Sequence, residues 1–362
     1  MSAESWSRPL LNFDLRAWRG LRRRNPSSLG WQLELRCYVA GGMLSALGAI
    51  QQALYRGALQ KLELRPPLFL VGHWRSGTTL LHELLALDSN FLTPSTYACF
   101  NPQHFLLTRH AAASSARGML RPTGDIEVRP DSPQEEEFAL LCLGALSPYE
   151  AFLFPAALSQ VAELSDPGRF KPAQARRWDQ TMTWILKAIA YAGGAHRQLL
   201  LKSPPHSFRI ARLRRLFEGA RFVRIVREPG AVFASTLRLW ESMWQRYALS
   251  PPPAREVLID ELLKIGLDLD RTMGEELDRL PAHDVATVRY EALVTDPYRT
   301  IGALYAQLRL KEPAGLRPRI EAYLLRHPTP ARLAQSSDHP PWRARVESEW
   351  AALYERYQYG RA

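Results

Sequence analysis

Three short stretches of the chain combine glycine, hydroxyl and basic residues where an apolar run changes into a helical pattern. The first spans residues 72–79 and contains, in order, Arg75, Ser76, Gly77, Thr78 and Thr79. A turn from a strand into a helix points backbone N–H groups and the positive end of the helix at its contents, which suits a phosphate group. A nucleoside triphosphatase would need lysine where this chain has Thr78. The stretch therefore predicts a site for an anion that requires no metal ion, such as a phosphosulfate.

The second stretch places a lysine and a histidine together. Lys202 ends the apolar run Gln198–Lys202, and His206 follows it after Ser-Pro-Pro. A lysine at the end of a buried strand is costly unless its ammonium emerges in a polar site, and ligands of parallel sheets bind beyond the carboxyl ends of the strands. Lys202 is thus expected in the ligand crevice, with His206 beside it as a candidate acid or base.

The third stretch again leads from a strand into a helix. Arg227 follows the apolar run Arg221–Val226, and Ser235 lies on the helix that comes next. A guanidinium group supplies charge and a fork of donors, so an arginine and a hydroxyl form a suitable pair for a terminal phosphate.

The elements that must position these residues alternate between strands and helices. The strand-like runs are Pro67–Gly72, Gln198–Lys202, Arg221–Val226 and Asp284–Val288. Helical periodicity covers Leu80–Leu87, Phe208–Phe217, Ala231–Tyr247 and Val257–Leu280. Such alternation predicts an α/β fold whose P-loop-like parallel sheet is flanked by helices on both faces.

Two domains are expected, a segment 1–64 and an α/β domain 65–362 that carries a helical insertion at about 90–197. The first contains a basic stretch and a helix over Trp31–Lys61, which either packs on the main domain or lies on an anionic membrane surface. Its apolar run, Cys37–Ile50, is shorter than the roughly 20 residues that cross a bilayer, so no transmembrane helix is predicted. Near the end we expect a loop over His327–Pro341 and a helix over Glu347–Tyr359.

Composition narrows the class of protein. The 362 residues are 46% hydrophobic, which excludes disordered and fibrous chains, and 47 Lys+Arg against 36 Asp+Glu give a net charge of +11 that favours anionic partners. The arginines are dispersed and no groove-reading motif occurs, so we expect no nucleic-acid partner. Three cysteines without metal-ligand spacing indicate neither disulfides nor zinc, and favour a reducing, cytoplasmic location.

Taken in order, the three stretches resemble the sulfotransferases that use 3′-phosphoadenosine 5′-phosphosulfate (PAPS). Residues 75–79 resemble their 5′-phosphosulfate loop, Arg227 with Ser235 their 3′-phosphate motif, and Lys202 the lysine that contacts the transferring sulfuryl group. Residues 288–293 resemble a late element of the bacterial and tyrosylprotein-like branch. The resemblance implies transfer of a sulfuryl group from PAPS to a hydroxyl, leaving 3′,5′-ADP (PAP), with no metal.

Two residues compete for the role of general base on the acceptor hydroxyl. His206 has a suitable ordinary pKa and lies in the Lys202 stretch, and we place it first. Glu135 belongs to an acidic triplet, with Glu136 and Glu137, in what reads as a helix that starts at a proline within Asp131–Leu140, a stretch that resembles one in uncharacterised bacterial members. The tyrosylprotein-like branch has its catalytic glutamate near the position of residues 94–97, where this chain has no acid.

The acceptor and the wider function stay open at this point. The aromatic residues Tyr149, Phe152, Phe154, Trp240 and Trp244 either belong to the core or line an acceptor pocket. In the second case the acceptor has an apolar body and is a lipid or lipid-linked alcohol, while small molecules and glycans are the other classes. The alternatives are a P-loop kinase or triphosphatase, and a non-catalytic protein with a nucleotide-binding fold at a membrane surface.

Overall fold

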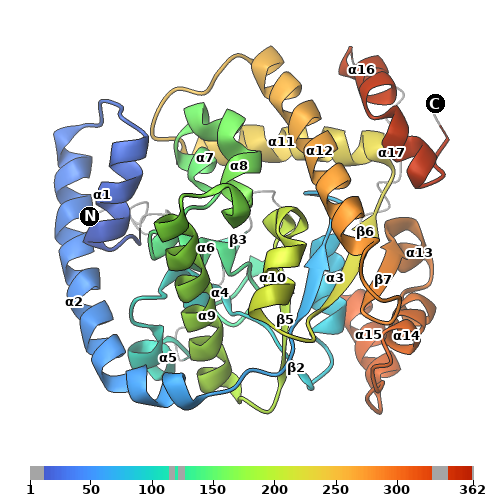
Figure 1. Cartoon of the computed structure of the whole chain (residues 1–362), viewed down its shortest axis with the longest axis horizontal. Coiled ribbons are helices and arrows are strands. Elements are labelled where there is room, and N and C mark those ends of the chain that lie inside the picture. Colours follow the sequence, from blue (N-terminus) through green and yellow to red (C-terminus); the bar gives the residue numbers. More distant parts are fainter. Residues whose placement is uncertain (1–11, 114–118, 121–126, 328–340, 361–362) are drawn as a thin grey trace.

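The computed structural model describes residues 12–113, 119–120, 127–327 and 341–360, and a parallel sheet lies at its centre (Figure 1). Within the described residues this sheet has five strands in the order β2-β5-β1-β6-β7. They are β1 (Leu68–Val71), β2 (Phe91–Leu92), β5 (Gln198–Lys202), β6 (Arg221–Val226) and β7 (Val285–Arg289). The four predicted strands are confirmed, and β2 is an additional strand of two residues that the sequence did not reveal.

The strand register brings the three stretches to one edge of the sheet. Leu70 of the central strand β1 is opposite Lys202 of β5, and Val71 is opposite Arg224 of β6. Because all these strands are parallel, the loop after β1, the end of β5 and the turn after β6 leave the sheet on the same side.

Alternate residues of the strands enter two separate cores. Phe69 and Val71 belong to the larger core, whereas Leu68 and Leu70 belong to the smaller one. The larger core is covered by α9 (Pro172–Gly193), α10 (Ile210–Leu216), α11 (Pro229–Tyr247) and α12 (Arg255–Leu277), together with η5 (Pro204–Phe208). The smaller one is covered by α3 (Thr78–Leu85), α13 (Tyr290–Thr295), α14 (Pro297–Gln307) and α15 (Leu316–Arg326). The prediction of a sheet flanked by helices on both faces is confirmed.

The stretch between β1 and β5 is mostly helical. It contains α4 (Thr96–Phe100), α5 (Phe105–Ala113), α6 (Glu137–Cys142), α7 (Glu150–Leu153), η3 (Pro155–Gln160), α8 (Val161–Ser165), η4 (Pro167–Arg169) and the hairpin strands β3 (Met119–Leu120) and β4 (Glu127–Val128). It is not an insertion of helices alone, because β2, the strand that follows α3, pairs with β5 in the main sheet.

The N-terminal part forms two helices, α1 (Leu15–Arg24) and α2 (Trp31–Lys61), at the side of the molecule away from β7 (Figure 1). The predicted bounds of the long helix are confirmed. Gln51 docks α2 on the main domain, since its side chain donates to the carbonyl of Pro102 and accepts from the amide of Leu106. By length and composition alone α2 is apolar enough to cross a membrane, which the sequence argument had not anticipated.

The chain ends beside the β6–β7 side of the sheet. The predicted last helix is two helices, α16 (Trp342–Glu349) and α17 (Ala351–Arg356). Trp350 lies between them and is fully buried, with its indole N–H donating to the carbonyl of Leu263 on α12. Most of the predicted loop His327–Pro341 lies outside the described residues.

Candidate active site

The loop from β1 to α3 leaves backbone N–H groups of the helix without side-chain partners. Gly77 is the N-cap of α3, has a φ of 102° and provides no capping side chain. The first N–H groups of a helix lack intrahelical acceptors, so those of Thr78 and Thr79 face the loop. A Cβ at residue 77 would lie 2.3 Å from the ring of Tyr290, which together with the positive φ explains the glycine. This end of α3 has the geometry that suits an anion.

Arg75 and Ser76 have different roles in this loop. Arg75 has a φ of 66°, which is uncommon for a residue with a side chain and is typical of functional sites. Ser76 is buried, and its hydroxyl donates to the carbonyl of His73 at 2.8 Å. Ser76 therefore holds the loop in shape, whereas Arg75 extends from it.

The turn from β6 to α11 lies against the same loop. A guanidinium N–H of Arg227 donates to the backbone carbonyl of Arg75 at 3.2 Å, and Arg75 Nε donates to Ser235 Oγ at 2.9 Å. The predicted 5′- and 3′-phosphate stretches are thus brought together, as one nucleotide spanning both would require.

The late element after β7 supports that turn. The guanidinium of Arg227 lies 4.3 Å from the centre of the Tyr290 ring, a cation–π contact. Glu291 accepts the backbone N–H of Glu228, and Glu228 itself caps α11 by accepting from the amides of Gly230 and Ala231. The roles of Tyr290 and Glu291 were not assigned from the sequence, although both lie in the stretch that carried the resemblance.

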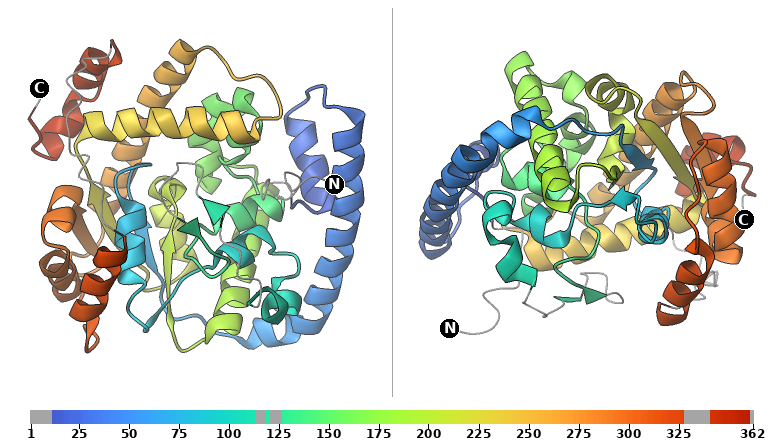
Figure 2. Two further views of the ribbon diagram at one scale, coloured as in Figure 1. Left: turned by 180° about the vertical axis from the view of Figure 1, so that it is seen from behind. Right: turned by 90° about the horizontal axis from the view of Figure 1, so that it is seen from below.

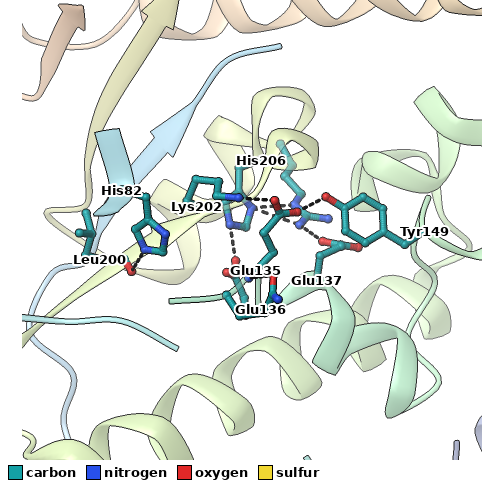
Figure 3. Close-up of polar contacts among 10 residues, drawn as sticks. His82, Glu135, Glu136, Glu137, Tyr149, Leu200, Lys202 and His206 are labelled. Atoms are coloured by element: carbon teal, nitrogen blue, oxygen red, sulfur yellow. Dashed lines mark hydrogen bonds and ion pairs between the residues drawn. The ribbon is translucent and has the colours of Figure 1, made fainter. Parts of the chain in front are cut away.

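Lys202 and Glu135 form an ion pair at the end of β5 (Figure 3). The other carboxylate oxygen of Glu135 accepts a hydrogen bond from the Tyr149 hydroxyl. Burial, reinforced by the charge of Glu135, raises the pKa of Tyr149 well above its ordinary value, so this phenol stays protonated and donates. The Glu135 side chain keeps 15% of its surface exposed, which leaves it open to a reactant.

Glu135 reaches Lys202 because its segment pairs with a distant one. Ser95 and Pro133 form an antiparallel bridge, and the amide of Gln134 donates to the carbonyl of Pro94 at 2.9 Å. The stretch where the resemblance would place an acid, residues 94–97, thus lies next to the segment that delivers Glu135. The predicted helix does not start at the proline: α6 begins at Glu137, with Glu136 as its N-cap, so Glu135 lies before the helix.

The other two glutamates of the triplet enter a sealed cluster behind Lys202 (Figure 3). Glu136 pairs with His206 and Glu137 pairs with Arg209, and all four side chains are completely buried. Arg209 Nε donates to His206 Nδ1 at 3.2 Å, so the ring carries its proton on Nε2, toward Glu136. Both ring nitrogens of His206 are therefore occupied inside the protein.

The aromatic residues considered for an acceptor pocket belong to the larger core. They contact one another in a chain from Tyr149 through Phe152 and Trp240 to Trp244, with ring centres 4.7 to 5.8 Å apart. Phe154 is equally buried. Of this group, Tyr149 alone has a described contact with a candidate catalytic residue.

Comparisons with known proteins identify the family of this chain. A family model described as the sulfotransferase family matches residues 66–313, and the chain belongs to this family. It is 31% identical over 367 residues to the omega-hydroxy-beta-dihydromenaquinone-9 sulfotransferases Stf3 of Mycobacterium bovis and Mycobacterium tuberculosis, covering 98% of this chain and 92% of theirs. The resemblance to sulfotransferases stated from the sequence is confirmed. These comparisons do not support the alternatives of a P-loop kinase or triphosphatase and of a non-catalytic protein at a membrane surface.

Two solved structures share the fold. Sulfotransferase STF9 from Mycobacterium avium superposes with a TM-score of 0.69 at 16% identity, over 96% of this chain and 93% of that one. Sulfotransferase STF1 from Mycobacterium tuberculosis gives 0.63 at 18% identity, over 93% and 91%.

Proposed function

We propose that this sulfotransferase transfers the sulfuryl group of PAPS to a hydroxyl of an apolar, lipid-linked acceptor. The observation that carries the proposal is the contact of the two anion-binding turns, in which Arg227 donates to the carbonyl of Arg75 and Arg75 donates to Ser235. A doubly phosphorylated adenosine has one phosphate for each turn. The side chains of Arg75, Arg227 and Ser235 would contribute to holding it without a metal ion.

The residues present fit such a donor. The uncapped amides of Thr78 and Thr79 would bind the 5′-phosphate, and Arg227 with Ser235 would bind the 3′-phosphate. Bound PAPS would supply an activated sulfuryl group. Lys202 is opposite Leu70, one residue before the end of β1, so we expect its ammonium near the loop that would hold the 5′ end.

Lys202, Glu135 and Tyr149 would perform the chemistry. An ammonium has three donors, so Lys202 can keep its contact with Glu135 while it neutralises the oxygen from which sulfur departs. Glu135 would take the proton of the acceptor hydroxyl as the acceptor oxygen bonds to sulfur and the bond from sulfur to the phosphate oxygen breaks. Tyr149 would hold the Glu135 carboxylate in position.

Glu135 is a better candidate for the base than His206. An acid or base must reach the proton that it moves. His206 is fully buried between Glu136 and Arg209, whereas Glu135 is partly exposed and touches Lys202. We therefore reverse the order given by the sequence and assign His206 to the support of the site.

The proposed class of acceptor is inferred from the substrate named for the similar Stf3 proteins. The Stf3 proteins are named for omega-hydroxy-beta-dihydromenaquinone-9, a menaquinone derivative, and their similarity extends over nearly all of this chain. A hydroxyl on such a lipid would be reached at a membrane surface. We place the enzyme in the cytoplasm, as its three buried free cysteines favour a reducing compartment, in peripheral contact with the membrane.

Calorimetry tests the donor site. We expect 3′,5′-ADP to bind without added metal and Mg-ATP not to bind. Arg227→Ala should weaken 3′,5′-ADP binding by about 10- to 100-fold, because a hydrogen bond to a charged group is worth about 1.5–3 kcal/mol. Arg238→Ala, at an exposed position on α11, is the matched control and should bind normally. Binding of Mg-ATP with no binding of 3′,5′-ADP would overturn the proposal.

A transfer assay tests the acceptor class. Purified enzyme is given radiolabelled PAPS with an omega-hydroxylated prenylquinone in detergent, or with a short water-soluble alcohol. We expect label in the prenylquinone. Label in the short alcohol alone would contradict the lipid acceptor while leaving the donor site intact.

A further inference from the structure

No other described element lies over the outward side of α2 (Figures 1 and 2). The large side chains exposed on this helix form an apolar stripe. Its large exposed side chains are Trp31 (72% exposed), Leu35, Val39, Met43 (66%), Ile50 and Leu54 (66%). They recur mostly at intervals of four residues, so they share one face of the helix. Contiguous exposed apolar surface of this kind marks an interaction site.

The opposite side of α2 is fixed to the protein. Gln51 makes its two hydrogen bonds with the segment that leads into α5, and Tyr55 donates to the carbonyl of Leu106. Next to Gly41, α1 packs so closely that a Cβ there would lie 3.2 Å from its backbone. Crossing a membrane would break these contacts, so a helix docked in this way can only lie flat on one.

Positive charge surrounds the stripe. The guanidinium of Arg19 lies 5.9 Å from the ring centre of Tyr38, at the border of the stripe, and Arg36 and Arg56 are exposed on α2 itself. Glu34 is the acidic residue of α2, and it is already paired with Arg22. The stripe thus consists of exposed apolar side chains bordered by positively charged arginines. This combination complements an anionic lipid surface.

We propose that this stripe is the membrane-docking face of the enzyme, with α2 lying in the plane of a bilayer rich in anionic lipids. Its apolar side chains enter the acyl boundary, and Arg19, Arg36 and Arg56 contact headgroups. The reason for docking, access to a lipid-linked acceptor, rests on the proposed function. The docking itself is measured without donor or acceptor, so either proposal can fail alone.

Vesicle flotation tests the docking. We expect the protein to float with vesicles of phosphatidylcholine and phosphatidylglycerol, and less with phosphatidylcholine alone. The triple variant Leu35→Ser, Val39→Ser, Met43→Ser should lose at least on the order of tenfold in affinity. Arg36→Gln and Arg56→Gln should each lose roughly fivefold. The matched control is Val257→Ser with Leu325→Ser, exposed apolar residues on α12 and α15, and it should bind like the wild type.

A fluorescent label tests the orientation. Burial raises the pKa of the Cys37 thiol to about 11 and raises those of Cys99 and Cys142, so the native thiols should react slowly. A polarity-sensitive dye on Met43→Cys should shift to the blue with anionic vesicles, and the same dye on Leu325→Cys should not. Equal responses at both positions, or none at residue 43, would overturn the proposal.

The other occupant to consider is a second copy of the chain. Analytical ultracentrifugation without lipid is expected to show a monomer for both wild type and the triple serine variant. A wild-type dimer that the triple variant converts to monomer would assign the stripe to self-association and would contradict membrane docking.

Discussion

Two clusters built from consecutive glutamates have opposite environments. Glu135, with Lys202 and Tyr149, stands at the open edge of the sheet, whereas Glu136 and Glu137, with His206 and Arg209, are sealed behind it. Each cluster pairs glutamate with nitrogen-containing side chains. Exposure separates them, because the Glu135 side chain keeps 15% of its surface exposed whereas Glu136 and Glu137 are completely buried. Under the proposed function, this difference selects Glu135 as the carboxylate that reacts.

The largest expected effect comes from the open cluster. Glu135→Gln keeps the shape of the side chain but removes the base, so turnover should fall by about 10²–10⁴-fold while 3′,5′-ADP affinity stays unchanged. Steady-state assays with labelled PAPS and calorimetry measure the two quantities. Glu241→Gln, at a surface ion pair on α11, is the control and should be fully active. Near-normal turnover in Glu135→Gln would show that Glu135 is not the base and would contradict the contrast drawn between the two clusters.

Lys202→Met should have the next largest effect. Without the ammonium, negative charge that develops on the leaving oxygen is not neutralised, and turnover should fall by roughly 10²–10³-fold. The same assay on Lys264→Met, where the ammonium is at the surface, should show no loss. A normal turnover number for Lys202→Met would remove this residue from the chemistry.

In the sealed cluster, His206→Gln should affect folding more than catalysis. Glutamine can still donate toward Glu136 but removes the acceptor that His206 Nδ1 offers to Arg209 Nε, while Arg209 keeps its pair with Glu137. The loss should cost about 1–3 kcal/mol in the free energy of unfolding measured in urea. Turnover of the folded enzyme should stay near that of the wild type. If turnover fell by the factor expected for a lost base while stability was unchanged, His206 would be the base after all.

The smallest effect concerns the pH dependence of stability. Burial alone would raise the pKa of Glu136, but the contact with His206 and the charge of Arg209 outweigh burial, so the pKa lies below its ordinary value of 4.5. The stabilisation is therefore fully present above pH 4.5 and is lost as the pH falls through the lower folded value. Urea unfolding of Glu136→Gln should show a gap to wild type that is constant near neutral pH and narrows in acid. A gap that widens in acid would contradict this assignment.

The sequence was sufficient for four of the five strands in the described sheet and for the positions of the turns after β1 and β6. Strands buried on both faces produce continuous apolar runs, and glycine, arginine and hydroxyl residues at their ends are local signals. The short strand β2 has no such signal, because two residues show no periodicity and depend on β5 for their pairing.

The sequence was not sufficient to choose among the glutamates. That choice depends on where α6 begins and on the bridge between Ser95 and Pro133, a contact between segments far apart in the chain. Arg209, which occupies one nitrogen of His206, likewise gave no sign of its role in the sequence. Only the folded chain shows that His206 is enclosed.

The central claim is that one nucleotide bridges the two turns and ends at Lys202 and Glu135. A crystal structure with 3′,5′-ADP tests it most directly. We predict the 5′-phosphate on the amides of Thr78 and Thr79, the 3′-phosphate on Arg227 and Ser235, and the Lys202 ammonium within hydrogen-bonding distance of the 5′-phosphate. A nucleotide bound elsewhere, or one whose 5′-phosphate lies away from Lys202, would contradict the account.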